Sequence, residues 1–187
     1  MENFAKPSRY SETTITELMI PSYANFGGKI HGGILLSLMD KAAYACASKH
    51  AGAYCVTVSV DTVDFLQPVE VGDLVFLKAR VNYVGNTSLV VGIKVIAENV
   101  KQGMVKHTNT SYFTMVAKDE DDEPATVPKL ILETQDEVRR FMEAIIRKYL
   151  KKQQKTEMSS VKNNLKLQDM INKIDEERCV IALKDNL

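Results

Sequence analysis

One long helix-forming stretch followed by four strand-like runs constrains the fold of this chain more than any other feature. Residues 32–50 are mainly Ala, Leu, Ile, Met, Ser and Lys without proline, which favours a helix of about five turns that Gly52 would end. A single helix and an antiparallel sheet bury most apolar surface when the sheet curls around the helix, so we predict an α+β fold. The strand-like runs are residues 54–66, 74–84, 88–98 and 105–117.

An additional strand precedes the helix, and short turns join most of the later ones. Residues 10–20 carry β-branched side chains and stop at Pro21, which predicts the first strand. Turns at Gly85 and Gly103 predict that consecutive strands pair antiparallel. Alternation of side chains within the run 54–66 predicts two faces. One face holds Val56, Val58 and Val60, and the other holds Thr57, Ser59 and Asp61.

The chain continues beyond the strands into an amphipathic helix. Thr134 and Glu137 form a capping box, after which apolar residues recur at helical spacing. We therefore divide the chain into a domain at residues 8–130, a C-terminal helix at 131–154 and an accessory tail at 155–187. The tail contains the pattern of another helix, and its CVIAL sequence suits a short strand or a docking segment.

Charge and cysteine content exclude several classes of protein. Lys plus Arg and Asp plus Glu both number 24, so no net charge attracts nucleic acid or an anionic membrane. The three cysteines match neither a disulfide framework nor a zinc site and indicate a reducing compartment. The N-terminus lacks a signal-peptide core, and no run approaches the roughly 18 apolar residues of a membrane span. We therefore expect a cytoplasmic protein.

Motifs of several enzyme classes are missing from the sequence, which has no G-x-S-x-G elbow, P-loop or dinucleotide fingerprint. His50 and His107 have no partners at metal-ligand spacing, so we expect no metal site. A basic cluster on the C-terminal helix suits a solvated helix face. Its members are Arg139, Arg140, Arg147 and Lys148.

Asp40 is the candidate catalytic residue because it stands in a mostly apolar helix. On the helical wheel it lies beside a polar stripe, flanked by Leu36, Ala47 and Tyr44. Partial burial raises the proton affinity of a carboxylate, which makes it a better general base. A surface aspartate paired with a lysine explains the helical position equally well.

The segment before Asp40 supplies further candidates. Gly32 and Gly33 would expose N–H groups at the helix start, where they can polarise a carbonyl oxygen, and they would equally allow close packing against the sheet. Asn25 could hold water or a carbonyl oxygen, although an asparagine beside glycines is usually a turn residue. His31 could act as a base or as a helix cap, and a structural role is the commoner one.

Ordered motifs connect these candidates to a known family. In chain order they are Asn25-(x)5-His31-Gly32-Gly33-(x)6-Asp40, Cys55-Val-Thr-Val-Ser-Val-Asp61, Phe65-(x)2-Pro68-(x)3-Gly72-Asp73, Gly85-Asn-Thr-Ser88 and Phe113-Thr-Met-Val-Ala117. Over about residues 10–150 the chain resembles the hotdog-fold acyl-CoA thioesterases, in the branch of the cytosolic acyl-CoA hydrolases and YciA-like enzymes.

The resemblance implies hydrolysis of acyl-CoA to a carboxylic acid and CoA. It implies a hotdog fold, dimers with one continuous sheet, often a trimer of dimers, and active sites at the dimer interface. Asp40 matches the catalytic aspartate, as general base or nucleophile, and Asn25 matches an asparagine that acts from the partner subunit. The backbone N–H of Gly33 or its neighbour would polarise the thioester carbonyl.

The resemblance also suggests where CoA binds. Because CoA is part of the substrate and a product, no separate cofactor is implied. The C-terminal helix would pack on or near the CoA site. Matching positions are Val58, Ser59 and Val60 in one strand, Thr87, Ser88 and Leu89 after a turn, and Arg147 in the helix.

Two other functions fit the same fold. A non-catalytic acyl-CoA sensor would bind without hydrolysis, but the chain has no basic patch for DNA and only a short N-terminus. A hotdog dehydratase or hydratase needs a positioned acid and histidine, for which His31 is available without matching partner spacing. We rank both below a thioesterase.

Overall fold

The computed structural model describes residues 4–164, 166–174 and 177–183. Contacts between residues divide the chain into two compact units, Met1–Ile145 and Ile146–Leu187. The first unit holds β1 (Ala5–Pro7), α1 (Ser8–Ser11), β2 (Thr13–Leu18), a 3₁₀ turn (Pro21–Tyr23), α2 (Gly32–Ala51), β3 (Tyr54–Val60), β4 (Leu74–Val84), β5 (Ser88–Asn99), β6 (Met104–Lys118) and β7 (Lys129–Ile131). Helix α3 (Gln135–Asn164) begins in the first unit and continues into the second, which also contains α4 (Leu167–Ile174).

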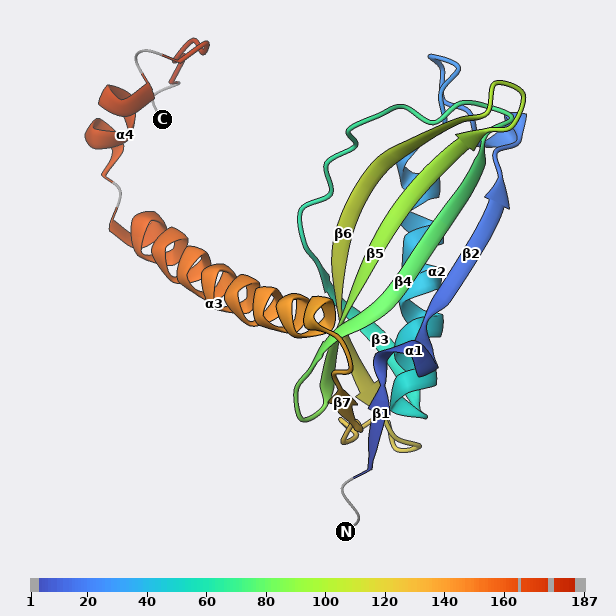
Figure 1. The fold of residues 1–187 in the computed structure, drawn as a ribbon. Coiled ribbons are helices and arrows are strands. Elements are labelled where there is room, and N and C mark those ends of the chain that lie inside the picture. Colours follow the sequence, from blue (N-terminus) through green and yellow to red (C-terminus); the bar gives the residue numbers. More distant parts are fainter. Residues whose placement is uncertain (1–3, 165, 175–176, 184–187) are drawn as a thin grey trace. The chain divides into compact units, whose positions relative to one another are not determined.

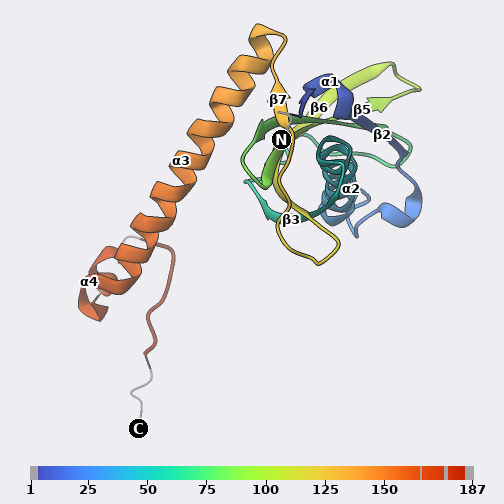
Figure 2. The same cartoon turned by 90° about the horizontal axis from the view of Figure 1, so that it is seen from below.

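Five antiparallel strands curl around α2 in the first unit. Their order across the sheet is β2-β4-β5-β6-β3. Figure 1 shows α2 behind the strands, and Figure 2 shows the helix nearly end-on with the strands around it. A separate pair, β1 and β7, runs parallel. The prediction of an α+β fold with its sheet wrapped around a central helix is confirmed.

The core lies between α2 and the concave face of the sheet. Strands β4 to β6 point alternate side chains inward, and Leu77 and Ile93 are fully buried there. The predicted apolar side of α2 is buried in the same core: Leu35, Leu38, Met39, Ala42, Ala43 and Cys46. Burial of this side fixes the rotation of α2 and keeps Asp40 at the surface.

Helix α2 ends as its sequence predicts. Gly52 has a φ of +71°, a conformation that glycine adopts without steric cost. Its N–H donates to the carbonyl oxygen of Ser48 at 2.8 Å, which satisfies one of the last carbonyl groups of the helix. The predicted end of the helix is therefore confirmed.

The first predicted strand is shorter than residues 10–20. Its start is occupied by α1, in which the hydroxyls of Ser8 and Ser11 are buried. The Ser8 hydroxyl donates to the carbonyl oxygen of Val81 at 3.2 Å, and the Ser11 hydroxyl donates to that of Ser8 at 3.2 Å. These hydroxyl bonds hold a helical turn where β-propensity alone predicts extended chain.

Strand β3 differs most from the prediction. It ends at Val60 rather than residue 66, and it pairs with β6 instead of its successor β4. The connection from β3 to β4 is too long to act as a hairpin turn, so β3 can reach the far side of the sheet. The expected alternation also fails, because Val58 is an extra, bulged residue between the paired Thr57 and Ser59.

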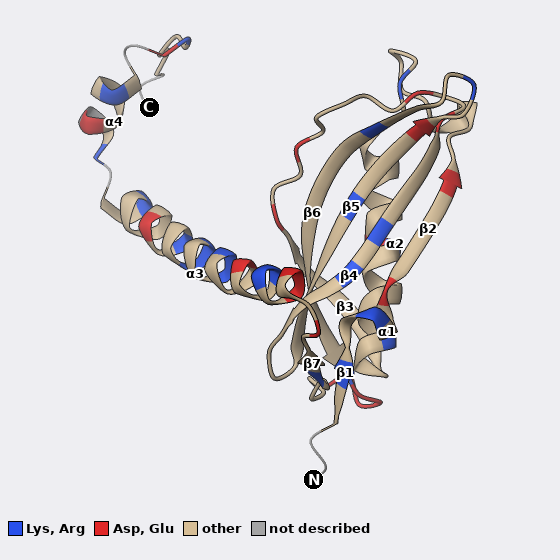
Figure 3. Ribbon diagram, viewed as in Figure 1, with Lys and Arg blue, Asp and Glu red and all other residues tan. Residues whose placement is uncertain are grey.

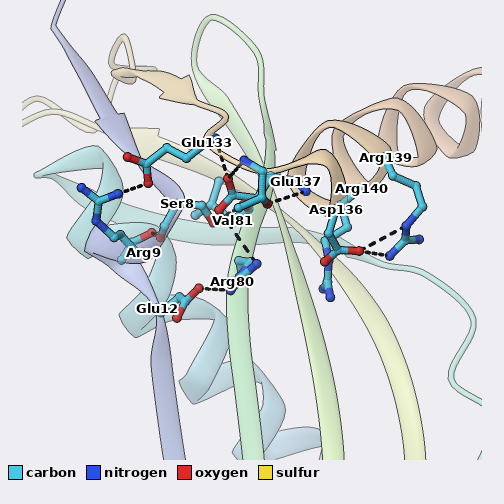
Figure 4. Close-up of polar contacts among 12 residues, drawn as sticks. Ser8, Arg9, Glu12, Arg80, Val81, Glu133, Asp136, Glu137, Arg139 and Arg140 are labelled. Carbon is cyan, nitrogen blue, oxygen red and sulfur yellow. Dashed lines mark hydrogen bonds and ion pairs between the residues drawn. The ribbon is translucent and has the colours of Figure 1, made fainter.

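The start of α3 is held by the predicted capping box. Glu137 accepts hydrogen bonds from the backbone N–H groups of Glu133 at 2.7 Å and Thr134 at 3.0 Å, and the Thr134 hydroxyl accepts one from Glu137 N–H at 3.2 Å. Figure 4 shows Arg80 of β4 between Glu12 and Glu137. Arg80 forms an ion pair with Glu12 and lies 3.9 Å from the Glu137 carboxylate.

The end of α3 lies beyond the predicted boundary at residue 154, and the helix continues to Asn164. The further helix expected in the tail is present as α4. Residues 179–183, all described, form no strand. None of the described helices has the length and apolar character needed to cross a lipid bilayer.

An apolar stripe along α3 is exposed in the single chain. Phe141 is covered by Tyr83 of β4, with ring centroids 5.0 Å apart. A contiguous exposed apolar surface can mark an interaction site. The exposed members are Val138, Met142, Ile145, Ile146, Tyr149 and Leu150.

Candidate active site

Asp40 is joined to strand β3 by a short hydrogen bond. The Thr57 hydroxyl donates to Asp40 Oδ1 over 2.6 Å, within the usual range for a hydroxyl on a carboxylate. This bond occupies one carboxylate oxygen and leaves Oδ2 to accept a proton or attack a carbon. Among the described residues, Asp40 makes no ion pair with a lysine, so the geometry differs from the surface pairing considered above.

A cavity of about 320 Å³ opens beside this pair, between α2 and β3. Two aromatic residues line it: Tyr44, one turn after Asp40, and Tyr54, whose rings lie 6.0 Å apart and are tilted by 59°. The other lining residues are Lys41, Cys55, Val56 and Thr57. The cavity therefore offers both a carboxylate and aromatic surface.

Cys55 lines this cavity but does not suit nucleophilic catalysis. Burial raises the pKa of its thiol, an effect that a hydrogen bond with Ser48 opposes. A thiol needs a lowered pKa to react as thiolate near neutral pH. Asp40 is therefore the better candidate for the reacting group.

The start of α2 is capped by His31. The His31 ring accepts a hydrogen bond from Gly33 N–H at 2.9 Å, and its carbonyl oxygen accepts one from Ile34 N–H at 2.9 Å. A Cβ at position 33 would lie 2.9 Å from the ring nitrogen, so the cap requires glycine. At position 32 a Cβ would lie 3.2 Å from the Phe65 ring. The cap role considered for His31 is therefore present, whereas Gly32 packs closely against Phe65 of the β3–β4 connection rather than against a strand of the sheet.

Asn25 lies in the exposed loop before α2. Its Oδ1 accepts hydrogen bonds from the N–H groups of Gly27 at 2.9 Å and Lys29 at 3.2 Å. The side-chain carbonyl oxygen of Asn25 therefore stabilises the loop. The hydrogen bonds found among the described residues leave Nδ2 unused, and this group can donate to a carbonyl oxygen or a water molecule.

The expected CoA-binding positions lie on three elements. Val58, Ser59 and Val60 occupy β3, an edge strand that pairs with β6 on one side, and all three are exposed or partly exposed. Thr87 and Ser88 lie in the β4–β5 hairpin and are partly exposed, whereas the Leu89 side chain is fully buried. Arg147 lies on α3 in the second unit.

The structure joins Asp40 to residues that the sequence did not single out. Thr57 donates to the carboxylate, although it was expected merely as part of a strand face, and Tyr54 lines the same cavity. Tyr44, which the helical wheel places beside Asp40, lines the cavity as well. Asn25 and Gly33 do not join them, since Gly33 lies about 10 Å from Asp40 along the helix axis at 1.5 Å per residue. Throughout the described ranges, no group of three His, Cys, Asp or Glu side chains could hold a metal ion.

Comparison with known proteins places the chain in a family. Residues 27–104 match the family model described as the thioesterase superfamily. The chain is 46% identical to protein VdlD of Helicobacter pylori over 72% of this chain and 76% of that one. It is 34% identical to YkhA of Bacillus subtilis, named an uncharacterized acyl-CoA thioester hydrolase, over 83% of this chain and 90% of that one. The chain belongs to the thioesterase superfamily.

Solved structures agree with this assignment. An apo-hexameric acyl-CoA thioesterase, 36% identical, matches with a TM-score of 0.78 over 81% of this chain and 97% of that one. The acyl-CoA hydrolase of Staphylococcus aureus, solved with butyryl-CoA and CoA, is 30% identical and matches with a TM-score of 0.76 over 85% of this chain and 97% of that one. The predicted hotdog fold is confirmed.

Proposed function

We propose that this chain hydrolyses acyl-CoA thioesters to a carboxylic acid and CoA. The observation that carries the proposal is the 2.6 Å hydrogen bond that holds Asp40 in an open cavity with one carboxylate oxygen left for chemistry. The names of YkhA and the S. aureus enzyme support the same substrate class.

Substituted forms of the S. aureus enzyme support the choice of residues. That protein has been solved with an asparagine, an aspartate or a threonine replaced by alanine. The three residues follow in the same order, with the same sequence separations, as Asn25, Asp40 and Thr57 of this chain. Thr57 therefore joins Asn25 and Asp40 in the proposed site.

Asp40 would act as general base. Its Oδ2 takes a proton from a water molecule, the water oxygen attacks the thioester carbon, and the carbon–sulfur bond breaks to release CoA as a thiolate that is then protonated. Thr57 keeps Oδ1 fixed, so that Oδ2 faces the substrate. In the nucleophilic variant, Oδ2 attacks the carbonyl carbon directly, the carbon–sulfur bond breaks to release CoA thiolate, which is then protonated, and water hydrolyses the resulting anhydride to regenerate Asp40 and free the acid.

The oxyanion donor and the base would come from different subunits. Gly33 and Asp40 are two turns apart on one helix face, so they lie on the same side but too far apart for one carbonyl group. A second α2 running antiparallel about a twofold axis near Leu36 and Ser37 would bring Gly33 of the partner subunit opposite Asp40. Leu36 and Ser37 are exposed, as this arrangement requires.

Self-association would also cover apolar surface that the single chain exposes. Val58 and Val60 on the β3 edge are 60% and 40% exposed, and a second β3 could pair there to extend the sheet. The hexameric assembly named for a related thioesterase supports an oligomer, which we propose as a dimer or a trimer of dimers. Asn25 would then reach the Asp40 site of a neighbouring subunit.

CoA would bind along the exposed part of this assembly. We propose contacts from Val58, Ser59 and Val60 and from Thr87 and Ser88, with Leu89 contributing packing alone because its side chain is buried. Arg147, on the part of α3 that belongs to the second unit, is proposed separately as a CoA contact on the resemblance alone. The reaction requires no separate cofactor in this scheme, because water and the carboxylate supply its chemistry.

Release of free thiol from acetyl-, butyryl-, hexanoyl- and decanoyl-CoA tests the proposal. The wild-type chain should release CoA, and Asp40→Asn should lose most of that activity while keeping its circular dichroism spectrum. Asp64→Asn, which changes an aspartate outside the cavity, is the matched control and should retain activity. Binding of acyl-CoA without hydrolysis by the wild type would favour a sensor, and near-normal turnover by Asp40→Asn would remove Asp40 from the mechanism.

A further inference from the structure

The outer face of the sheet carries a second, larger hollow. It has a volume of about 520 Å³ and is lined by residues of β2, β4, β5 and β6 and by the first turns of α3. Lys78 of β4 lines it, whereas its neighbour Leu77 is fully buried in the core and does not line the hollow. Because side chains alternate across a strand, this hollow and the Asp40 cavity lie on opposite faces of the sheet.

Two lysines face each other in this hollow without a neutralising acid. Lys78 of β4 and Lys94 of β5 are direct cross-strand partners, and Figure 3 shows lysine and arginine positions marked on both strands. Like charges directly opposite one another destabilise a sheet. In the described part of the chain neither lysine forms an ion pair. Thr14 and Thr110 pair with these lysines on either side and add hydroxyl groups to the row.

The acidic residues around the hollow are already engaged. Glu12 is paired with Arg80, and Glu143 is paired with Arg139. At the rim, Asp136 accepts hydrogen bonds from Arg139 at 2.5 Å and Arg140 at 2.6 Å, as Figure 4 shows. These bonds lower the pKa of Asp136 and keep its carboxylate ionised beside the arginines. The charge left without compensation is therefore that of the lysine pair.

A buried amide also faces the hollow. Asn82 is 4% exposed, lines the cavity, and its Oδ1 has no hydrogen-bond partner. It is the extra residue of a bulge in β4, between the paired Val81 and Tyr83. Bulges commonly redirect a side chain beside a functional site. A buried acceptor without a donor is rare enough in folded proteins to need an explanation.

Gly92 makes room for this amide. A Cβ at position 92 would lie 2.3 Å from Asn82 Nδ2, closer than any side chain tolerates. The bulge on β4 and the glycine on β5 are thus two features that together hold one polar side chain in the wall of the hollow.

We propose that this hollow binds a small organic phosphate. The phosphate group would lie between Lys78 and Lys94, and a hydroxyl or amino group of the same molecule would donate to Asn82 Oδ1. The volume lies within the roughly 300–1,000 Å³ usual for small-molecule sites. Since the site lies on the far side of the sheet from Asp40, its ligand is distinct from the thioester group being hydrolysed.

Isothermal titration of the full chain with four probes tests the proposal. Ribose 5-phosphate carries both recognised groups, ribose lacks the phosphate, inorganic phosphate lacks the hydroxyls, and adenosine 3′,5′-bisphosphate represents the phosphates of CoA itself. Ribose 5-phosphate should bind more tightly than ribose or inorganic phosphate. Tighter binding of the bisphosphate, with competition by CoA, would identify CoA as the source of the phosphate only if the Lys78/Lys94 variant loses that binding; if the variant keeps it, the bisphosphate occupies the proposed CoA site instead and counts against the hollow.

Matched variants locate the binding. Lys78→Gln with Lys94→Gln should weaken binding of the phosphate probe by about tenfold or more, the effect of losing charge-assisted hydrogen bonds. Lys101→Gln with Lys155→Gln removes the same charge elsewhere and should leave affinity unchanged. Gly92→Ala should weaken binding by displacing Asn82.

Several results would overturn the proposal. Wild-type protein that binds no phosphate probe at millimolar concentration would do so, as would equal affinity in the Lys78/Lys94 variant and its control. A changed oligomeric state of the Lys78/Lys94 variant by light scattering, without probe binding to the wild type, would show that the hollow is a subunit contact. Thioester hydrolysis should remain at the wild-type rate in the absence of added phosphate, because none of these residues lines the Asp40 cavity.

Discussion

Replacing Thr57 by valine should slow the proposed hydrolysis without unfolding the protein. Valine has nearly the shape of threonine and cannot donate the 2.6 Å hydrogen bond to Asp40. The χ2 angle of an aspartate has a broad distribution. Without that bond the carboxylate would therefore sample orientations in which Oδ2 turns away from the substrate. The expected effect is therefore on kcat, with little change in KM.

The size of the effect follows from the kind of bond that is lost. A hydrogen bond to a charged group contributes about 1.5–3 kcal/mol. At about 1.4 kcal/mol for each factor of ten in rate, its complete loss in the transition state corresponds to a decrease in kcat of roughly tenfold to a hundredfold.

Steady-state release of CoA from butyryl-CoA measures this effect. Thr57→Ser keeps the hydroxyl and should retain most of the activity. Thr16→Val makes the same chemical change as Thr57→Val, but at an exposed position of β2, and should leave the activity unchanged. Circular dichroism and thermal unfolding would confirm that each variant is folded. A Thr57→Val enzyme within twofold of the wild type would refute the positioning role, as would an equal loss in Thr57→Ser.

Three further predictions test the site and its surroundings. Asn25→Ala and Asp40→Asn should each be poorly active, and mixed oligomers should regain activity in thiol-release assays; no recovery after subunit exchange verified by mass spectrometry would contradict a shared site. Tyr44→Ala should shift the preference towards longer acyl chains by severalfold, because it removes part of the cavity wall; an unchanged activity profile would place the acyl chain elsewhere. Burial lowers the pKa of His50, so the unfolded state binds more protons, and stability to urea should fall as pH drops below about 6.5. His50→Asn should reduce the dependence of the free energy of unfolding on pH in this range. An unchanged dependence would show that other titrating groups cause it.

Elements with local signals were predictable from the sequence. The proline-free stretch and Gly52 defined α2, and the turns at Gly85 and Gly103 placed β4, β5 and β6 within a residue or two. The capping box at Thr134 was equally local. In each case the bonds that define the element join residues a few positions apart, so a short window of sequence contains the necessary information.

The position of β3 could not be predicted in the same way. Its pairing with β6 joins residues such as Thr57 and Met115, which are far apart in the chain. The bulge at Val58 depends on that pairing and interrupts the side-chain alternation that the sequence suggests. The bond from Thr57 to Asp40 joins a strand to a helix 17 positions earlier, and no local pattern signals it, so the aspartate was identified and its hydroxyl partner was missed.

The cap at the start of α2 determines what substrate binding must displace. The His31 ring holds the Gly33 N–H at 2.9 Å, and that is the N–H proposed to polarise a thioester carbonyl. Ring nitrogen and carbonyl oxygen compete for one donor, so the imidazole must rotate away as the thioester arrives. The helix then exchanges one acceptor for another and keeps its number of hydrogen bonds. His31 would thus accept the hydrogen bond of the Gly33 N–H between turnovers and keep this donor aligned for the next thioester.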